Sequence, residues 1–155
     1  CQNEASHAQT SAVDELRKKE HRAGLDSAIG YEGFDERVRS VRAGLLDFLA
    51  TARKNGETVA AYGAAAKGNT LLNYCGVTVD EIAYCVDRNP AKQDTLLPGS
   101  HIPVYPVGHL RAERPDYVLI LPWNLRAEIS AQLSDLAALG SKFVTPVPQI
   151  EIFDK

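Results

Sequence analysis

At 155 residues with 45% hydrophobic content, the chain is long enough to bury a core and is near the usual size of one domain. A charged fraction of 24% and a formal net charge of -3 exclude a broad cationic surface for a nucleic-acid backbone, so an anion must be bound locally. No apolar run approaches the roughly 20 residues that cross a bilayer, and no signal-peptide pattern opens the chain. We expect a soluble, cytoplasmic protein with no nucleic-acid or membrane partner.

The cysteines and histidines give no metal signature. Cys1, Cys75 and Cys85 are widely spaced and form no CxxC pair, which argues against a disulfide framework or a structural zinc site and favours a reducing compartment. Three histidines have no spacing for a metal or a catalytic triad, and we expect them at the surface. These are His7, His21 and His109. The chain also lacks methionine, even at position 1, as a segment of a larger protein would.

Residues 1–33 predict a polar lead-in with a short, exposed helix in the charged stretch from Glu15 to Arg22. From residue 34, apolar residues recur at helical spacing, acids lie in the first turn, and bases precede Gly56. This pattern predicts a helix over 34–55. We place the main domain at 34–155 and interpret 1–33 as a linker that leads into it.

From residue 58, short apolar runs alternate with helical stretches, as in a parallel sheet with crossover helices. The predicted helices are 68–75 and 125–139, the second with Leu125, Ile129, Leu133 and Leu136 as its buried stripe. The predicted strands are 58–62, 82–86, 102–105, 116–121 and 142–146. The fold class is therefore α/β: a Rossmann-like, doubly wound, mostly parallel five-stranded sheet with flanking helices, preceded by an N-terminal helical segment.

Ligands of open α/β sheets bind beyond the carboxyl ends of the strands, and a small-residue loop follows the first predicted strand. Its small side chains let backbone N–H groups and a helix N-terminus approach an anion, while a lysine adds charge and the last two residues add an amide and a hydroxyl. The loop matches neither GxGxxG nor a Walker loop. It predicts a phosphate or pyrophosphate site, or a tight turn that needs small residues for packing. The candidate binding residues are Gly63, Ala64, Lys67, Gly68, Asn69 and Thr70.

Asp87 and Asn89 follow the second predicted strand. Asp87 lies 24 residues beyond Gly63, near the position where a dinucleotide fold has its ribose ligand, although an exposed turn closed by Asn-Pro is equally compatible. The next loop, Lys92 to Pro103, either folds over a ligand or is a surface connection.

Trp123 and Asn124 follow the most hydrophobic strand. The indole can stack on a base or sugar, or pack as an edge residue. Asn124 can bind a ligand, but we favour a role as the N-cap of the following helix.

Three ordered segments, YGAAAKGNTLLNYCG, VDRNPAKQDTLLPGSHIPV and PDYVLILPWNLRAEI, resemble the C-terminal domain of SAM-dependent C-methyltransferases that act on nucleotide-linked deoxysugars. The similarity covers about residues 30–153. Asp94 departs from the family pattern, where we expect a glycine or another small residue, and this puts an anion contact by Lys92 in doubt. The motif carries over to Gly63, Lys67, Gly68, Asn69, Asp87, Asn89, Trp123 and Asn124.

In that family a zinc-binding segment and a SAM-binding lobe precede this domain, and the sugar nucleotide, typically dTDP-linked, lies where the lobes meet. The resemblance therefore implies a substrate-binding lobe that binds no cofactor itself, with SAM, a structural zinc and the catalytic base all upstream of Cys1. No catalytic residue is assigned, and the chain alone is expected to be inactive. The residues leave open a nicotinamide- or CoA-binding module, and a lobe that only supports its neighbour.

Overall fold

A computed structural model describes residues 10–154, so the predictions for Cys1 and His7 lie outside the described residues. Contacts divide the chain into two compact units, one ending at Arg37 and the other beginning at Val38. The predicted domain boundary at residues 33 and 34 stays a prediction. Within 10–154, no helix is both long and apolar enough to cross a membrane.

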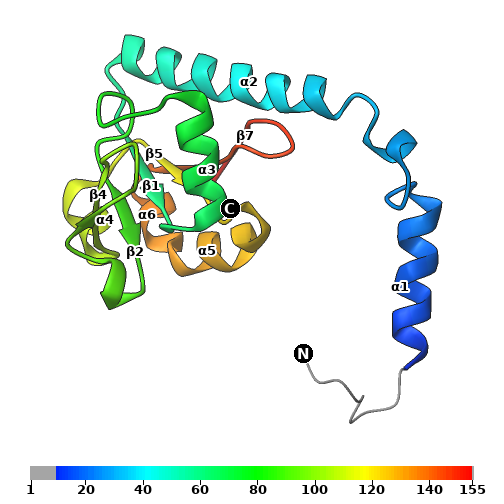
Figure 1. The fold of residues 1–155 in the computed structure, drawn as a ribbon. Helices are drawn as coiled ribbons and strands as arrows, with labels where there is room; N and C mark the ends of the chain where they lie inside the picture. The colour runs from blue at the N-terminus through cyan, green and yellow to red at the C-terminus, as the bar shows by residue number, and fades with distance from the viewer. Residues whose placement is uncertain (1–9, 155) are drawn as a thin grey trace. The chain divides into compact units, whose positions relative to one another are not determined.

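The amino-terminal unit contains helix α1 (Ser11–Arg22) and the 3₁₀ turn η1 (Ala28–Tyr31) (Figure 1). Neither element has a buried residue. In the last turn of α1, His21 Nδ1 lies 2.5 Å from Oδ2 of Asp26, a residue beyond the helix, and this hydrogen bond raises the pKa of the imidazole. The predicted exposed helix is confirmed and begins at Ser11.

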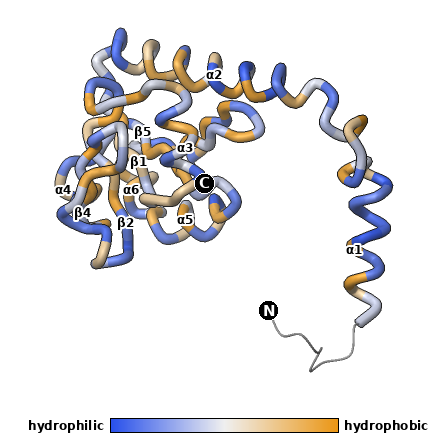
Figure 2. Tube along the Cα trace, in the orientation of Figure 1, coloured by the Kyte–Doolittle hydropathy of each residue, from blue (hydrophilic) through white to orange (hydrophobic). Residues whose placement is uncertain are grey.

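Helix α2 (Phe34–Asn55) has the bounds that the sequence predicts. Acidic residues in its first turn and basic residues in its last turn favour the helix dipole, and Gly56 follows at a φ of +73°. Hydrophilic and hydrophobic residues alternate along its length (Figure 2). Its buried residues are Leu45, Leu49 and Ala52.

The carboxy-terminal unit is built on a seven-stranded sheet of order β3-β4-β2-β1-β5-β6-β7. The five inner strands are parallel and correspond to the five predicted strands. The sequence missed β3 and β7, the antiparallel edge strands, because two or three residues are too few to show a period. The strands are β1 (Val59–Tyr62), β2 (Cys85–Asp87), β3 (Thr95–Leu96), β4 (Pro103–Pro106), β5 (Tyr117–Ile120), β6 (Lys142–Thr145) and β7 (Glu151–Phe153).

Helices cover both faces of this sheet, which makes two separate apolar cores. Residues of α2 and of α3 (Ala66–Cys75) form one core, and residues of α4, α5 and α6 form the other. Alternate residues of β1 enter opposite cores, as the pleat of a strand requires. The second group of helices is α4 (Gly108–Glu113), α5 (Arg126–Gln132) and α6 (Ser134–Ala138).

Three sequence expectations on this second face are wrong. The predicted helix 125–139 is interrupted at Leu133, and Leu125, assigned to its buried stripe, is 44% exposed. His109, expected at the surface, is half-buried because its ring packs 4.6 Å from Tyr84 and 4.4 Å from Tyr105, measured between ring centroids. Helix α4, which carries His109, was too short to be predicted.

The chain leaves β1 through α3 toward β2, whereas it leaves β5 through α5 and α6 toward β6 on the other side of the sheet. Connections that diverge from neighbouring parallel strands open a crevice beyond their carboxyl ends, which is where open α/β sheets bind ligands. We call the region between the carboxyl ends of β1 and β5 the switch point. The loops beyond it are 63–65 and 121–122.

Candidate functional site at the switch point

Gly63 is the first residue after β1 and is buried, with a φ of +88°. Its N–H donates to the Val86 carbonyl at 2.7 Å, which continues the sheet ladder. A β-carbon at this position would lie 2.7 Å from Pro122 Cδ, in the loop after β5. Both the backbone conformation and the space therefore require glycine, and the two loops are in direct contact.

Gly68, in the first turn of α3, makes a second close approach between the same elements. A β-carbon there would lie 2.5 Å from Leu121 Cβ. The small residues of the loop are thus needed for packing, as the tight-turn interpretation expects. The same packing brings the N-terminus of α3 to the switch point, as the anion-site interpretation requires, so the two interpretations are compatible.

Lys67 projects from the start of α3 to the loop after β5. Its ammonium donates to Asn124 Oδ1 and lies 4.4 Å from the centroid of the Trp123 ring. The predicted N-cap role of Asn124 is wrong: Asn124 lies inside the 3₁₀ turn η3 (Trp123–Leu125), and α5 begins without a side-chain cap. The fold thus brings together residues that the sequence singled out in two separate segments.

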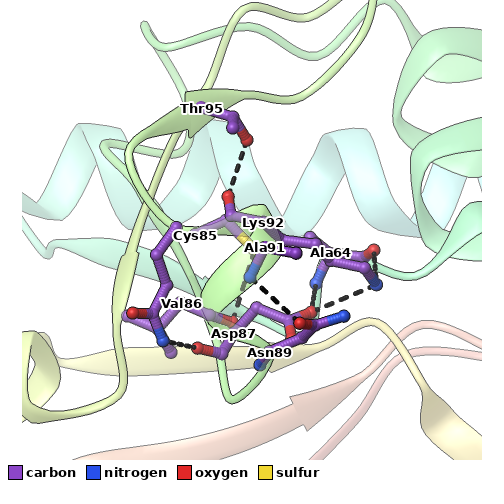
Figure 3. A network of polar contacts seen from close by, with 9 residues as sticks. Ala64, Cys85, Val86, Asp87, Asn89, Ala91, Lys92 and Thr95 are labelled. Carbon is purple, nitrogen blue, oxygen red and sulfur yellow. Dashed lines mark hydrogen bonds and ion pairs between the residues drawn. The ribbon is translucent and has the colours of Figure 1, made fainter.

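Asp87, at the end of β2, binds the small-residue loop (Figure 3). Its Oδ2 accepts the Ala64 N–H at 2.7 Å, and its Oδ1 accepts the Asn89 N–H at 2.8 Å. The Lys92 ammonium donates to the Ala64 carbonyl at 2.7 Å and lies 3.5 Å from Asp87 Oδ2. Both peptide groups of Ala64 are therefore held by side chains, and the Asp87 carboxylate is already engaged by its own chain.

Asn89 and Asp94 shape the segment that carries Lys92. Asn89 Oδ1 accepts the Ala91 N–H at 3.0 Å and so caps the 3₁₀ turn η2 (Pro90–Lys92). Asp94 has a φ of +59°, in the left-handed region, which a glycine adopts without strain. The Lys92 to Pro103 loop is mostly a hairpin, since β3 within it pairs with β4.

Asn69 and Thr70 differ in what their side chains contact. Thr70 Oγ1 donates to the Ala66 carbonyl at 3.1 Å, within α3. Asn69 Oδ1 is buried and has no hydrogen-bond partner among the described residues. The first N–H groups of α3 have no intrahelical acceptor, as at any helix N-terminus, which leaves donors near Lys67.

A family model described as the C-methyltransferase C-terminal domain matches residues 1–148. The chain belongs to this family. It is 35% identical over 145 residues to the C-methyltransferase NovU of Streptomyces niveus, and the match covers 94% of this chain and 34% of that protein. This C-methyltransferase C-terminal domain therefore spans about a third of the length of its curated relative.

Among solved structures, the domain is similar to UDP-D-quinovosamine 4-dehydrogenase from Vibrio fischeri, at 19% identity and a TM-score of 0.42. The similarity covers 57% of this chain and 76% of the dehydrogenase chain.

Other parts of the C-methyltransferase C-terminal domain offer less chemistry. Within residues 10–154, no group of three or more histidine, cysteine, aspartate or glutamate side chains is placed to hold a metal ion. A cleft of about 330 Å³ lies between α2 and Tyr117, and one of about 560 Å³ lies along α5 and α6. Neither is lined by residues of the switch point.

Sequence reasoning missed the partners that complete the site. Leu121 and Pro122 determine how closely α3 approaches β5, and the Tyr62 hydroxyl donates to Gln132 Oε1 at 2.9 Å, which ties β1 to α5. The sequence feature that could have identified Pro122 as part of the site is its position directly after the most hydrophobic predicted strand. No local pattern identifies Gln132, which is 70 residues from Tyr62.

Proposed function

We propose that this domain is the nucleotide-sugar-binding lobe of a SAM-dependent C-methyltransferase. The observation that carries the proposal is the place of the Lys67 ammonium, over the Trp123 ring and beside the N-terminus of α3. A sugar nucleotide that binds at a switch point needs two kinds of contact. A cation and the N–H groups of a helix N-terminus can bind its diphosphate, and an aromatic face can stack on its base or sugar. Family membership supports the same assignment.

The ten candidate residues would have different roles in this site. We propose that Lys67, Asn69 and Trp123 contact the nucleotide sugar. Lys67 carries the positive charge, Asn69 has a buried side-chain oxygen without a partner among the described residues, and Trp123 has an aromatic face. The others would build the site by packing, capping or holding the loop. These are Gly63, Ala64, Gly68, Thr70, Asp87, Asn89 and Asn124.

In the intact enzyme, a base would remove a proton from the carbon beside the sugar carbonyl. The resulting enolate carbon would then attack the methyl group of SAM, the S–CH₃ bond would break, and S-adenosylhomocysteine would leave as a neutral thioether. The loop after β1 here, GAAAKG, is not the acidic-glycine loop of a SAM site. We propose that the methyl donor, the base and a structural zinc belong to upstream lobes. This domain would hold the sugar nucleotide in position and screen its diphosphate, which lowers the entropic part of the barrier.

Thermal unfolding of the 155-residue chain with dTDP, NAD or CoA tests the assignment, since a ligand of the native state raises the midpoint. We expect dTDP to raise it for the parent chain and for Lys142→Met, an exposed control, and not for Lys67→Met. A rise with NAD or CoA alone would favour a different nucleotide module. No rise with any of the three would favour a lobe that acts only through protein contacts.

A second experiment measures ligand binding to the intact enzyme, because a site shared between lobes binds its ligand more weakly when only one lobe is present. There, Lys67→Met should weaken nucleotide-sugar binding by about tenfold, as expected for loss of one charge-assisted contact, and leave SAM binding unchanged. Equal loss of both ligands, or loss of neither, contradicts the proposed role of this lobe.

A further inference from the structure

We propose that Asn124 is a positioning residue that holds the Lys67 ammonium at the switch point, together with the Trp123 ring, before any anion arrives. The inference rests on the proposed function and extends it to a residue that touches Lys67 rather than the ligand. It follows from one contact set: the ammonium donates to Asn124 Oδ1 and lies 4.4 Å from the indole centroid.

The two loops that carry these groups are fixed against each other by contacts that leave no room for a side chain. A β-carbon on Gly63 would meet Pro122 Cδ at 2.7 Å, and one on Gly68 would meet Leu121 Cβ at 2.5 Å. Lys67 lies one residue before Gly68, and Asn124 lies two residues after Pro122. Because these contacts fix the two backbone segments against each other, the distance between the backbones of Lys67 and Asn124 is also fixed.

A side chain held in this way still has capacity for a ligand. An ammonium has three N–H donors, and a single amide oxygen takes one of them. The indole face attracts the cation without using a donor. Two donors therefore stay available, and a diphosphate oxygen can bind while the contact with Asn124 persists.

Holding Lys67 matters because a free lysine samples many rotamers, and these are lost when it binds an anion. Asn124 and Trp123 restrict the side chain in advance, which reduces that loss. Fixing one such side chain corresponds to about a three- to tenfold change in affinity. We expect Asn124→Leu to weaken binding of inorganic pyrophosphate by this factor, and Lys67→Met to weaken it further.

Trp123 is the only tryptophan of the chain, so its fluorescence reports the ammonium over its ring without any ligand. We expect Asn124→Leu and Lys67→Met each to change the Trp123 emission, and the double variant to match Lys67→Met alone. Ala127→Leu, an exposed change on α5, should leave the spectrum as in the parent chain. Unchanged emission in both single variants overturns the proposal, as does an additive effect in the double variant.

The affinity arm uses calorimetric titration of the full 155-residue chain with inorganic pyrophosphate. Weaker binding by Asn124→Leu but not by Ala127→Leu supports the positioning role, and equal binding by Asn124→Leu and the parent overturns it. If the parent binds no pyrophosphate, the proposed anion site fails, while the fluorescence arm still decides whether Asn124 holds Lys67. Failure of the inference is therefore distinguishable from failure of the proposed function.

Discussion

Gly68 lies against Leu121 so closely that a β-carbon on the glycine would stand 2.5 Å from Leu121 Cβ and 3.1 Å from Leu121 Cγ. The contact joins the first turn of α3 to the residue after β5, two segments about 50 residues apart in the sequence. Leu121 is fully buried and cannot withdraw without disturbing the core that it shares with β1 and β5.

Gly68→Ala should therefore destabilise the domain by about 1–3 kcal/mol, the usual result of overpacking a well-filled core. For a chain of this size that corresponds to a fall in the unfolding midpoint of roughly 2–12 °C. Gly108→Ala is the matched control, because Gly108 also lies in the first turn of a helix and a β-carbon there would meet nothing within 4 Å. Thermal unfolding of both variants measures the difference, and equal midpoints would contradict the close packing.

Asp87→Ala should also lower stability, through lost polar contacts and not through packing. The change leaves the Ala64 and Asn89 N–H groups without their acceptor and removes one of two partners of the Lys92 ammonium, which keeps its contact with the Ala64 carbonyl. Leaving buried or half-buried donors unpaired costs about 1–3 kcal/mol for each strongly desolvated group, and the exposed Asn89 adds less.

Urea unfolding of Asp87→Ala measures this loss against Asp80→Ala, a change in an exposed turn that should stay within about 0.5 kcal/mol of the parent chain. If the two variants unfold alike, the Asp87 carboxylate does not hold the loop as the structure indicates.

The sequence predicted the fold well because that fold depends on local, periodic patterns. Helix α2 shows three signals at once, its apolar spacing, its terminal charges and Gly56, and both its bounds were correct. The five inner strands were found because each is an apolar run bounded by turn residues. By contrast, α5 and α6 continue one helical pattern, and the interruption at Leu133 has no local marker.

For the candidate site, the sequence identified the right segments but not their mutual contacts. Lys67 and Asn124 were chosen for separate reasons, an anion contact and a helix cap, and only the crossover of the chain brings them together. Asp87 was chosen as a ribose ligand from its spacing, yet its carboxylate accepts the Ala64 N–H. Contacts between residues 23 or 57 positions apart depend on sheet order, which no local pattern encodes.

Asp116 should make stability depend on pH in the acid range. The Thr58 N–H, at 2.7 Å, and then the Thr58 hydroxyl, at 2.8 Å, hold the pKa of this carboxyl below its usual value of about 3.9. Because the folded state binds the proton more weakly than the unfolded state, the contribution is present above the unfolded pKa and is lost as pH falls through the folded pKa.

We therefore expect Asp116→Asn to be less stable than the parent chain at pH 7, with a difference that shrinks toward pH 2. Chemical unfolding of both chains at several pH values measures it, and the effect should be small because Asp116 is exposed. A difference that does not change with pH would show that the Thr58 contacts do not depend on the charge.

Cys85 and Cys75 should resist thiol reagents as long as the domain is folded. Burial raises the pKa of the Cys85 thiol to about 12 and also raises that of Cys75, and the two side chains are 0% and 4% exposed. The thiolate is the reactive form, so at pH 8 neither residue presents a nucleophile to solvent. In a Cys1→Ser chain, which keeps only these two cysteines, we expect slow labelling by a disulfide reagent without denaturant and prompt labelling of both thiols in urea. Further replacement of Cys85 by alanine assigns the two reactions, and fast labelling of Cys85 in the folded chain would contradict its burial in the sheet.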